Sequence, residues 1–331
     1  MSIDYSDITF VVQGDVADIT FKTFASIRKH LPGAPIVMST STPNSLLNKL
    51  EADDVVISPD PGARPIGDWP GAKMNNINRQ IVSSRQGLKK VKTKYAFKIR
   101  SDYLIDGVGF LDYFDKFPKC DENFRIFKHK LLAGCYFSRN PRMQDPNPYH
   151  PSDVAFFGLA EDLVNLFDIP LDDFTTRYVD ERGACHCQYI PEQYLFISYL
   201  RKIGRVVPCR CAIDVTPENI VETEKYFASN FIMLDFQRFN LSSIREAFDI
   251  SLNPPGFHSC FTHTEWIQLY RDHVDASHPE PDDDPDRRVV NGLYQKFRIY
   301  RRISNIIVLP IRNKELRDRK RNQLMRYFVR V

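Results

Sequence analysis

Short apolar runs and amphipathic segments alternate through the first hundred residues. The apolar runs, which have the composition of β-strands, cover residues 8–14, 34–42, 54–62 and 94–105. The segments between them, whose apolar residues have helical spacing, cover residues 19–33, 43–53 and 77–90. Strands that alternate with helices over short connections form a mostly parallel sheet flanked by helices. The sequence therefore predicts a Rossmann-type α/β fold with its ligand site along the edge where the strands end.

Charged residues stand at the end of the fourth run, KYAFKIRSDYLI. Every second residue from Tyr95 to Ile99 is large and apolar, which is typical of a strand, and the run then reaches Arg100 and Asp102. Mg²⁺ and Mn²⁺ often take only one or two protein carboxylates, with phosphates and water as the other ligands. Asp102 alone can therefore hold such an ion against a nucleotide diphosphate, and Arg100 is expected to contact a phosphate. In the alternative interpretation, Ser101 and Asp102 only open a turn.

The segment NNINRQ, residues 75–80, opens the helix that precedes this strand. Asn78 and Arg79 belong to a dense group of hydrogen-bonding side chains at a helix N-terminus, a place suited to an anion or to sugar hydroxyls. We therefore expect both residues to contact the phosphates or sugar of a donor. In the alternative interpretation, Asn76 is only a helix cap and Arg79 only a solvated surface residue.

The run NNINRQIVSSRQGLKKVKTKYAFKIRSDYLI, residues 75–105, resembles the core of the WavE family of bacterial lipopolysaccharide-synthesis proteins. The later segments HPSDVAFFGLAEDLVNLF (150–167) and PEQYLF (191–196) are similar to downstream blocks of that family, so the resemblance covers about residues 1–205. It implies a glycosyltransferase of the GT-A type. Residues 1–105 would form the nucleotide-sugar-binding half, and residues 106–276 the acceptor-binding half of the same domain.

The resemblance also implies how the donor is held. Such enzymes usually carry an Asp-x-Asp motif whose second Asp binds the metal, and here Arg100 replaces the first Asp. Only Asp102 therefore carries over as a ligand of Mn²⁺ or Mg²⁺, and an arginine could take over part of the charge neutralisation. By the same resemblance, three residues at or beyond the ends of the earlier strands are candidates for nucleoside contact, namely Gln13, Ser39 and Asp60.

Inverting transfer requires a base that deprotonates the acceptor hydroxyl, and a carboxylate is the usual choice. Glu192 follows Pro191 at a helix start, a placement similar to that of the base in many inverting GT-A enzymes. We favour inversion with Glu192 as the base; a retaining transfer would not use it in this way. Asp153 is the second candidate and could instead bind acceptor hydroxyls. In the alternative interpretation, Glu192 has no catalytic role and only complements the positive end of the helix dipole.

A late histidine often joins the metal shell of GT-A enzymes. His258 and His263 in FHSCFTHTEW are the positions that fit this expectation, and His263 is our choice. Most histidines have no such role.

Charge divides the end of the chain from the rest. Residues 277–293 include an acidic, Pro-rich stretch that reads as a linker. The tail, residues 294–331, contains twelve Lys/Arg and two Asp/Glu, a balance of +10, which leaves −7 for the rest of a chain whose net charge is +3. Basic residues interleaved with apolar ones, and divided by Pro310, predict two amphipathic helices on an anionic inner-membrane surface, where a lipid-linked glycan acceptor would lie. The alternative is a helix packed on the body with its arginines in solvent.

The remaining features limit the other classes of function. The chain has no apolar stretch of the ~20 residues that a membrane span needs and starts without a basic region and apolar core, so we expect a cytoplasmic, peripheral protein. A sugar nucleotidyltransferase is an alternative enzyme, but VVQGDVADI is not the Gly-rich phosphate loop that such enzymes usually carry. A nucleic-acid-binding protein is a second alternative. The acidic charge of the rest of the chain argues against it.

Overall fold

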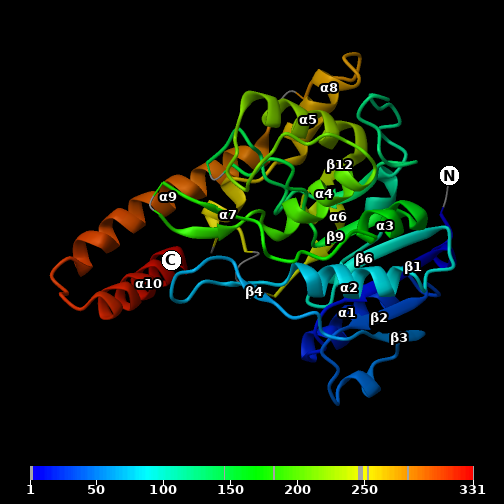
Figure 1. Ribbon diagram of the computed structural model, residues 1–331, viewed down its shortest axis with the longest axis horizontal. Coiled ribbons are helices and arrows are strands. Elements are labelled where there is room, and N and C mark those ends of the chain that lie inside the picture. The colour runs from blue at the N-terminus through cyan, green and yellow to red at the C-terminus, as the bar shows by residue number, and fades with distance from the viewer. Residues whose placement is uncertain are drawn as a thin grey trace.

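A seven-stranded sheet forms the centre of the computed structural model, which describes residues 3–144, 146–181, 183–244, 249–251, 253–281 and 283–330 (Figure 1). Its strands, in the order in which they lie side by side, are β12 (Phe231–Leu234), β8 (Leu131–Gly134), β9 (Ala155–Leu159), β6 (Tyr95–Arg100), β1 (Ile8–Gln13), β2 (Ile36–Thr40) and β3 (Asp54–Ile57). Within this sheet β9 runs antiparallel to its neighbours and the other pairs are parallel. The predicted mostly parallel α/β architecture is confirmed, and it is consistent with a GT-A-like fold.

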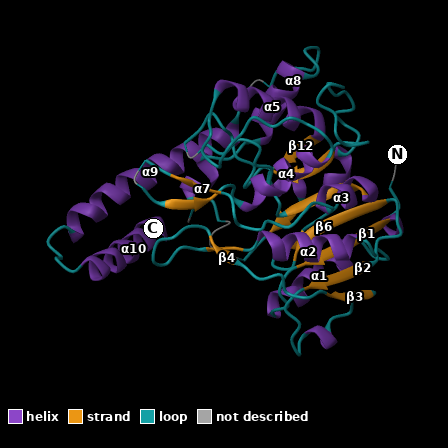
Figure 2. Cartoon of the chain, in the orientation of Figure 1, coloured by secondary structure: helices purple, strands orange, loops and turns teal. Residues whose placement is uncertain are grey.

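Helices flank this sheet and follow it along the chain (Figure 2). They are α1 (Asp18–His30), α2 (Ile77–Leu88), α3 (Ala160–Phe167), α4 (Pro191–Lys202), α5 (Pro217–Asn230), α6 (Phe236–Phe239), α7 (Pro254–His258), α8 (His263–His273), α9 (Pro285–Val308) and α10 (Lys314–Arg330). Three two-stranded sheets complete the fold, formed by β4 (Arg64–Pro65) with β5 (Met74–Asn75), β7 (Leu104–Ile105) with β13 (Leu241–Ser242), and β10 (Arg177–Val179) with β11 (Cys185–Cys187).

The sheet is buried on both faces except at its edge strand β3, where alternate residues are exposed. On one face Phe10 stacks on Phe97, which meets Phe110 edge-on. On the other face α2 and α3 cover the central strands, and α4 packs on these two helices. As a consequence Lys98, which the alternating pattern would place on an exposed face, is completely buried. Burial on both faces is typical of parallel strands and hides the alternation of polar and apolar residues.

One predicted helix is shortened, and one segment with the composition of a strand is irregular. The helix expected over residues 43–53 is reduced to one 3₁₀ turn, Leu47–Lys49, because Asn44 bonds the backbone N–H of Leu46 and donates to the carbonyl of Val16. Residues 205–214, which have the composition of a strand, form an irregular connection instead. Neither difference changes the central sheet.

The C-terminal region is a helical hairpin. The predicted division at Pro310 is confirmed, since α9 ends at Val308 and α10 starts at Lys314. The segment expected as a linker, residues 277–293, becomes helical at Pro285, where the side chain of Asp284 caps α9 by accepting from the N–H of Arg287. Within the described residues, no helix combines the length and the apolarity that crossing a membrane requires.

Gly87 sets how closely α2 approaches the sheet. A Cβ at this position would lie 2.5 Å from Cγ1 of Val11 and 2.9 Å from Cβ of Ser39. We expect Gly87→Ala to lower the free energy of unfolding by about 1–2 kcal/mol, because overpacking outweighs the gain in helix propensity. Gly292→Ala in α9 is the matched control: nothing lies near its Cβ, so stability should rise slightly. Denaturant unfolding of both variants checks the prediction, and equal or higher stability of Gly87→Ala would contradict it.

Candidate donor site at the carboxyl edge of the sheet

A pocket of about 410 Å³ opens where β1 and β6 end. The chain passes from β1 outward to β2 and β3 and then returns to place β6 on the other side of β1. Such a reversal leaves a crevice at the carboxyl ends of the two central strands, where ligands bind in open α/β sheets. The lining residues come from the β1 turn, the starts of α1 and α2, and the β6 turn, and are Gln13, Gly14, Asp15, Ala17, Ile19, Asn76, Arg79, Gln80, Arg100, Ser101 and Asp102.

The turns that follow β1 and β6 support each other. Ser101 donates its backbone N–H to the carbonyl of Gln13 (2.9 Å) and its hydroxyl to the carbonyl of Asp15 (2.7 Å). Gly14 has a φ of +133°, and a Cβ there would lie 2.8 Å from the hydroxyl oxygen of Ser101. Glycine is therefore required where the two turns meet. Ser101 does belong to a turn, as the alternative interpretation expects, and this turn forms a wall of the pocket.

Arg100 and Asp102 lie on the pocket wall and bind each other. Nε of Arg100 donates to Oδ1 of Asp102 (3.1 Å) and Nη2 donates to Oδ2 (3.0 Å). Only 18% of the Asp102 side chain and 32% of the Arg100 side chain are exposed. A phosphate that binds Arg100, or a cation that binds Asp102, must therefore compete with this two-point ion pair.

Arg79 enters the pocket from the first turn of α2. Its Nε and Nη2 donate to the two carboxylate oxygens of Asp60 (2.8 and 2.7 Å), and its Nη1 donates to Asn76 (3.1 Å). The hydrogen bonds from Arg79 lower the pKa of Asp60 to about 2. Asp60 thus orients the guanidinium group, although Asp60 itself is not among the lining residues of the pocket.

Asn78 and Ser39 use their polar atoms within the fold. The side-chain amide of Asn78 donates to the carbonyl of Asp172 (2.8 Å) and its oxygen accepts from the N–H of the same residue (2.8 Å). Ser39 is buried and donates its hydroxyl to the carbonyl of Ser83 in α2 (2.6 Å). Neither residue lines the pocket, so their contact with a donor stays a prediction.

Asp153 lies two residues before the start of β9 and is linked to the pocket. The N–H of Arg100 donates to the carbonyl of Val154 (3.2 Å), which places Asp153 beside the end of β6. Its carboxylate accepts a hydrogen bond from Gln80, a pocket residue, and its carbonyl accepts one from Nζ of Lys98 (2.5 Å). Burial lowers the pKa of Lys98 to about 8, although the negative charge of Asp153 acts to raise it.

Glu192 occupies the first turn of α4, as predicted. Its side chain is 16% exposed, and one carboxylate oxygen lies 3.4 Å from Nε2 of the buried His150. Burial and the nearby charge of Asp153 raise the pKa of Glu192 to about 8. The positive charges of Arg139 and Arg100 act in the opposite direction. Burial also lowers the pKa of His150 to about 3, so this imidazole is neutral at pH 7. Glu192 therefore has a proton affinity close to that of a general base that works near neutral pH.

His263 lies elsewhere. Its Nδ1 is 2.6 Å from the carbonyl oxygen of Met233 in β12, and its ring packs on Trp266 and Tyr113. Burial lowers the pKa of His263 to about 4. Since β8 and β9 separate β12 from β6, the structure does not bring His263 to Asp102. His258 stacks on Tyr294 of α9, also outside the pocket. In the part of the chain that the structure describes, no three or more His, Cys, Asp and Glu side chains are arranged to hold a metal ion.

Four of the predicted site residues line one pocket, namely Gln13, Arg79, Arg100 and Asp102. The sequence predicted no role for Asp15, Lys98 or His150, and it indicated Gln80 only as one member of the hydrogen-bonding group in NNINRQ. Gln80 and His150 stand inside the segments that carried the resemblance, NNINRQ and HPSD, so their position was a usable signal. Lys98 gave no signal, because an alternating lysine in a strand normally faces solvent.

A comparison with known families shows to which family the sequence is similar. The sequence model of the family described as WavE lipopolysaccharide synthesis matches residues 8–299. The match includes both halves of the sheet and ends within α9, well beyond the stretch of residues 1–205 that carried the resemblance. No curated protein matches the chain.

Proposed function

The chain belongs to the WavE lipopolysaccharide synthesis family, and from this premise we propose that it transfers a sugar from a nucleotide diphosphate-sugar to a lipopolysaccharide, O-antigen or capsule glycan. The observation that carries the proposal is the pocket at the reversal of strand order, in which two arginines meet the starts of two helices. Its volume of about 410 Å³ lies within the usual range of small-molecule sites.

The pocket is suited to a diphosphate. The N-termini of α1 and α2 both open onto it, and free N–H groups at helix N-termini favour anions. Arg79 and Arg100 supply guanidinium groups, which bind phosphates at two points. We propose that a donor diphosphate draws these groups away from Asp60 and Asp102, its charge replacing that of the carboxylates. Gln13, at the end of β1, lies in the same pocket and is proposed to contact the nucleoside.

We also propose Mn²⁺ or Mg²⁺ as the cofactor. Asp15 and Asp102 both line the pocket, and oxygen ligands of this kind fit either ion when phosphates and water complete the shell. Asp102 would hold the ion, which when bound would neutralise charge on the leaving diphosphate. Arg100 would then share this task, because it already lies against Asp102.

For the transfer itself we propose inversion with Glu192 as the base. Glu192 would accept the proton of the acceptor hydroxyl as that oxygen attacks the anomeric carbon. Asp153, between Gln80 of the pocket and the neighbourhood of Glu192, would bind acceptor hydroxyls. His150, whose Nε2 lies 3.4 Å from the carboxylate of Glu192, would orient that carboxylate.

The acceptor is proposed to be a lipid-linked glycan at an anionic inner-membrane surface. The basic hairpin formed by α9 and α10 would bring the enzyme there, which makes it a peripheral protein on the cytoplasmic side. This part of the proposal rests on the charge of residues 294–331 and not on the pocket.

Arg79→Met tests the donor site. We expect the affinity for the preferred nucleoside diphosphate to fall about tenfold or more, because a charged hydrogen-bond donor to phosphate is lost. Calorimetric titration with uridine, guanosine, cytidine, adenosine and thymidine diphosphates measures this effect and identifies the base. Arg28→Met is the matched control, since Arg28 forms a similar ion pair with Asp53 outside the pocket. Unchanged affinity in Arg79→Met, or no nucleotide binding by the wild type, would contradict the proposed donor site.

A further inference from the structure

The α9–α10 hairpin projects from the body of the protein. Figure 1 shows α9 leaving the body and α10 returning beside it, with the turn between them at the far end. The two helices pack along each other, and the rings of Tyr300 and Phe328 stack with centroids 5.3 Å apart. Ser304 and Val308 are buried. The hairpin is therefore a formed structural element whose turn lies away from the donor pocket.

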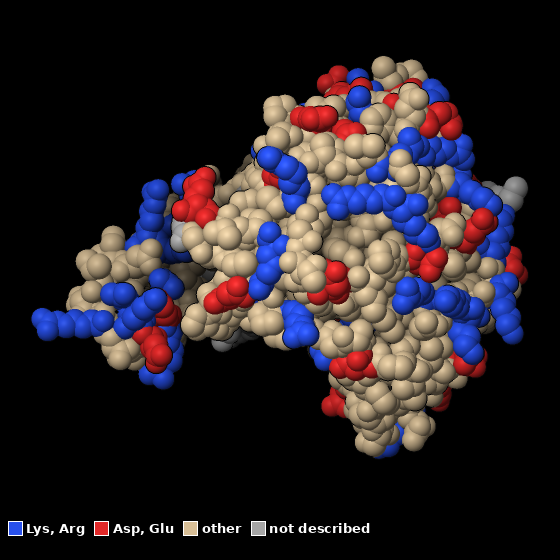
Figure 3. Space-filling view, viewed as in Figure 1, with Lys and Arg blue, Asp and Glu red and all other residues tan. Residues whose placement is uncertain are grey.

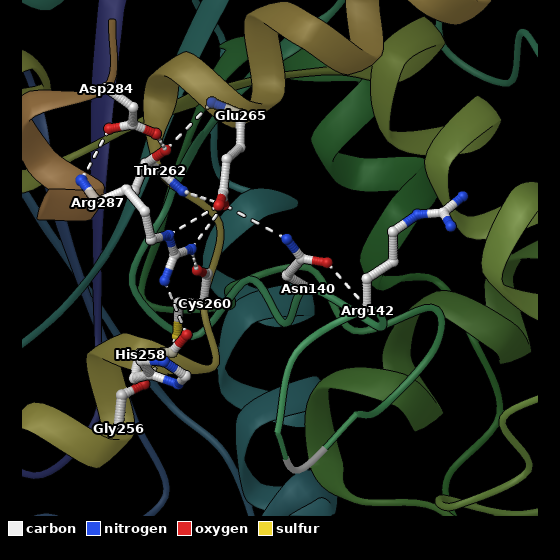
Figure 4. A network of polar contacts seen from close by, with 9 residues as sticks. All are labelled: Asn140, Arg142, Gly256, His258, Cys260, Thr262, Glu265, Asp284 and Arg287. Atoms are coloured by element: carbon white, nitrogen blue, oxygen red, sulfur yellow. Dashed lines mark hydrogen bonds and ion pairs between the residues drawn. The ribbon is translucent and has the colours of Figure 1, made fainter. Parts of the chain in front are cut away.

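The base of the hairpin is fixed by buried charges (Figure 4). The Arg287 side chain donates to both carboxylate oxygens of Glu265 in α8 (2.7 and 2.6 Å) and to the carbonyls of His258 (2.9 Å) and Cys260 (2.6 Å). Asp284, one turn earlier, accepts from the hydroxyl of Thr262 (2.5 Å). These contacts hold the first turn of α9 against α7 and α8, so the direction of α9 is set by the body.

Large apolar side chains are exposed toward the far end of α9. Ile299, Ile303, Ile306 and Ile307 follow helical spacing and form one stripe, and Leu309 continues it into the turn. Ile306 is 70% and Leu309 73% exposed. On the wheel of α9 this stripe lies beside the face that carries Ser304 and Val308, so contact with α10 leaves it uncovered.

Basic side chains lie near this stripe. Exposed cations lie before and after the turn, at Arg298, Arg301, Arg302, Arg312 and Lys314. Figure 3 shows Lys and Arg side chains on the projecting hairpin, together with some Asp and Glu and with the surface of other residues between them. An apolar stripe with cations at its sides is what a helix needs to lie in the headgroup region of an anionic bilayer.

We propose that the hairpin tip, defined as Ile306, Ile307 and Leu309, inserts into the headgroup region of an anionic phospholipid bilayer. Ile299 and Ile303 extend the inserted stripe, and Arg302 and Arg312 bind lipid phosphates. Because α9 is fixed at Arg287, the insertion also holds the donor pocket at a set distance from the bilayer. The inference deepens the proposed function and rests on it only for the location of the acceptor.

Charge distinguishes a bilayer from the other occupants of this surface. A second copy would bring the balance of +10 of its residues 294–331 against the same charge on the first, which opposes association, whereas anionic lipid neutralises this charge. A nucleic acid would neutralise the arginines but leave the exposed isoleucines in water. A bilayer accommodates both the charge and the apolar stripe.

Vesicle binding by the full chain tests the proposal. The variant carries Ile306→Ser, Ile307→Ser and Leu309→Ser together, and the control carries Val206→Ser and Ile213→Ser, two exposed apolar residues of the body. With phosphatidylglycerol–phosphatidylethanolamine vesicles we expect the wild type and the control to co-sediment. The vesicle affinity of the tip variant should be lower by about tenfold or by a larger factor. Phosphatidylcholine vesicles should bind all three weakly.

Insertion has its own readout. In Ile306→Trp the added indole fluorescence should shift to the blue on anionic vesicles, while Val206→Trp should show no shift. The proposal would be overturned if the tip variant bound anionic vesicles as tightly as the wild type does, or if the fluorescence of Ile306→Trp did not shift. A dimer that the tip variant abolishes would favour a second copy instead, and tight duplex DNA binding that the serines do not weaken would favour nucleic acid. Nucleotide titration of the tip variant keeps this test apart from the donor site, because its affinity should equal that of the wild type.

Discussion

Glu192→Gln is expected to lower kcat by about 10²–10⁴-fold while the KM for the donor stays nearly unchanged. The substitution keeps the size and hydrogen-bonding capacity of the side chain but removes its ability to accept the acceptor's proton. The proposed donor contacts, Arg79 and Arg100, are not changed by this substitution. Steady-state kinetics at saturating donor measures the effect.

The pH dependence provides a second readout for Glu192. Burial and Asp153 raise its pKa from 4.5 to about 8, so the carboxylate form becomes abundant in the folded protein only as the pH rises through about 8. The wild-type kcat/KM should therefore increase with pH up to and through this value, and Glu192→Gln should lack the step. The same shift means that ionisation of Glu192 opposes folding. Its cost grows as the pH rises from 4.5 toward 8, so the stability advantage of Gln should be largest at high pH.

A matched control separates the base from a helix-dipole residue. Glu218 follows Pro217 in the first turn of α5, just as Glu192 follows Pro191 in α4, but Glu218 is exposed. Glu218→Gln removes the same favourable contact with the helix dipole. If both variants kept kcat within about threefold of the wild type, Glu192 would be a helix-dipole residue only, or the transfer would retain configuration.

The fold was predictable where a single pattern determines it. Alternating strands and helices over the first hundred residues specified a mostly parallel sheet, and the position of Asp102 at a strand end specified the edge that forms the pocket. Side-chain pairing was not predictable, because it depends on distant segments. Asn78 forms hydrogen bonds with the backbone of Asp172, 94 residues away, and Arg79 forms an ion pair with Asp60, which lies in a loop. Both residues stand in a motif whose composition alone indicates ligand binding.

Burial explains the other differences between sequence and structure. Lys98 belongs to an alternating strand, but a helical layer covers its face, so the amine reaches Asp153 instead of water. His263 was chosen for its residue type, whereas its position was decided by the aromatic cluster of α8 and by β12. A histidine in a core and a histidine at a metal have the same local sequence signal, and only the order of the strands distinguishes them.

Asp102→Asn is expected to weaken binding of the preferred nucleoside diphosphate in the presence of Mn²⁺ by about thirtyfold or more, that is, by about 2 kcal/mol. The neutral amide is a poor metal ligand, so the contribution of a bound Mn²⁺ to diphosphate affinity is lost. Asp53→Asn is the matched control: Asp53 pairs with Arg28 away from the pocket, so the change should leave nucleotide affinity as it is. Titration with and without Mn²⁺ measures both effects.

The same titrations decide how the diphosphate charge is neutralised. If Asp102 holds a metal, wild-type affinity should fall when the metal is removed, and Asp102→Asn should respond to Mn²⁺ weakly or not at all. Removing the carboxylate also releases Arg100 from its two-point pair, so affinity without metal should be kept or should rise. If wild-type binding is equally tight with and without metal, and Arg100→Met abolishes it, the arginine that stands where the first Asp of the motif is expected has replaced the ion. The donor site would then be a metal-free one built on Arg79 and Arg100.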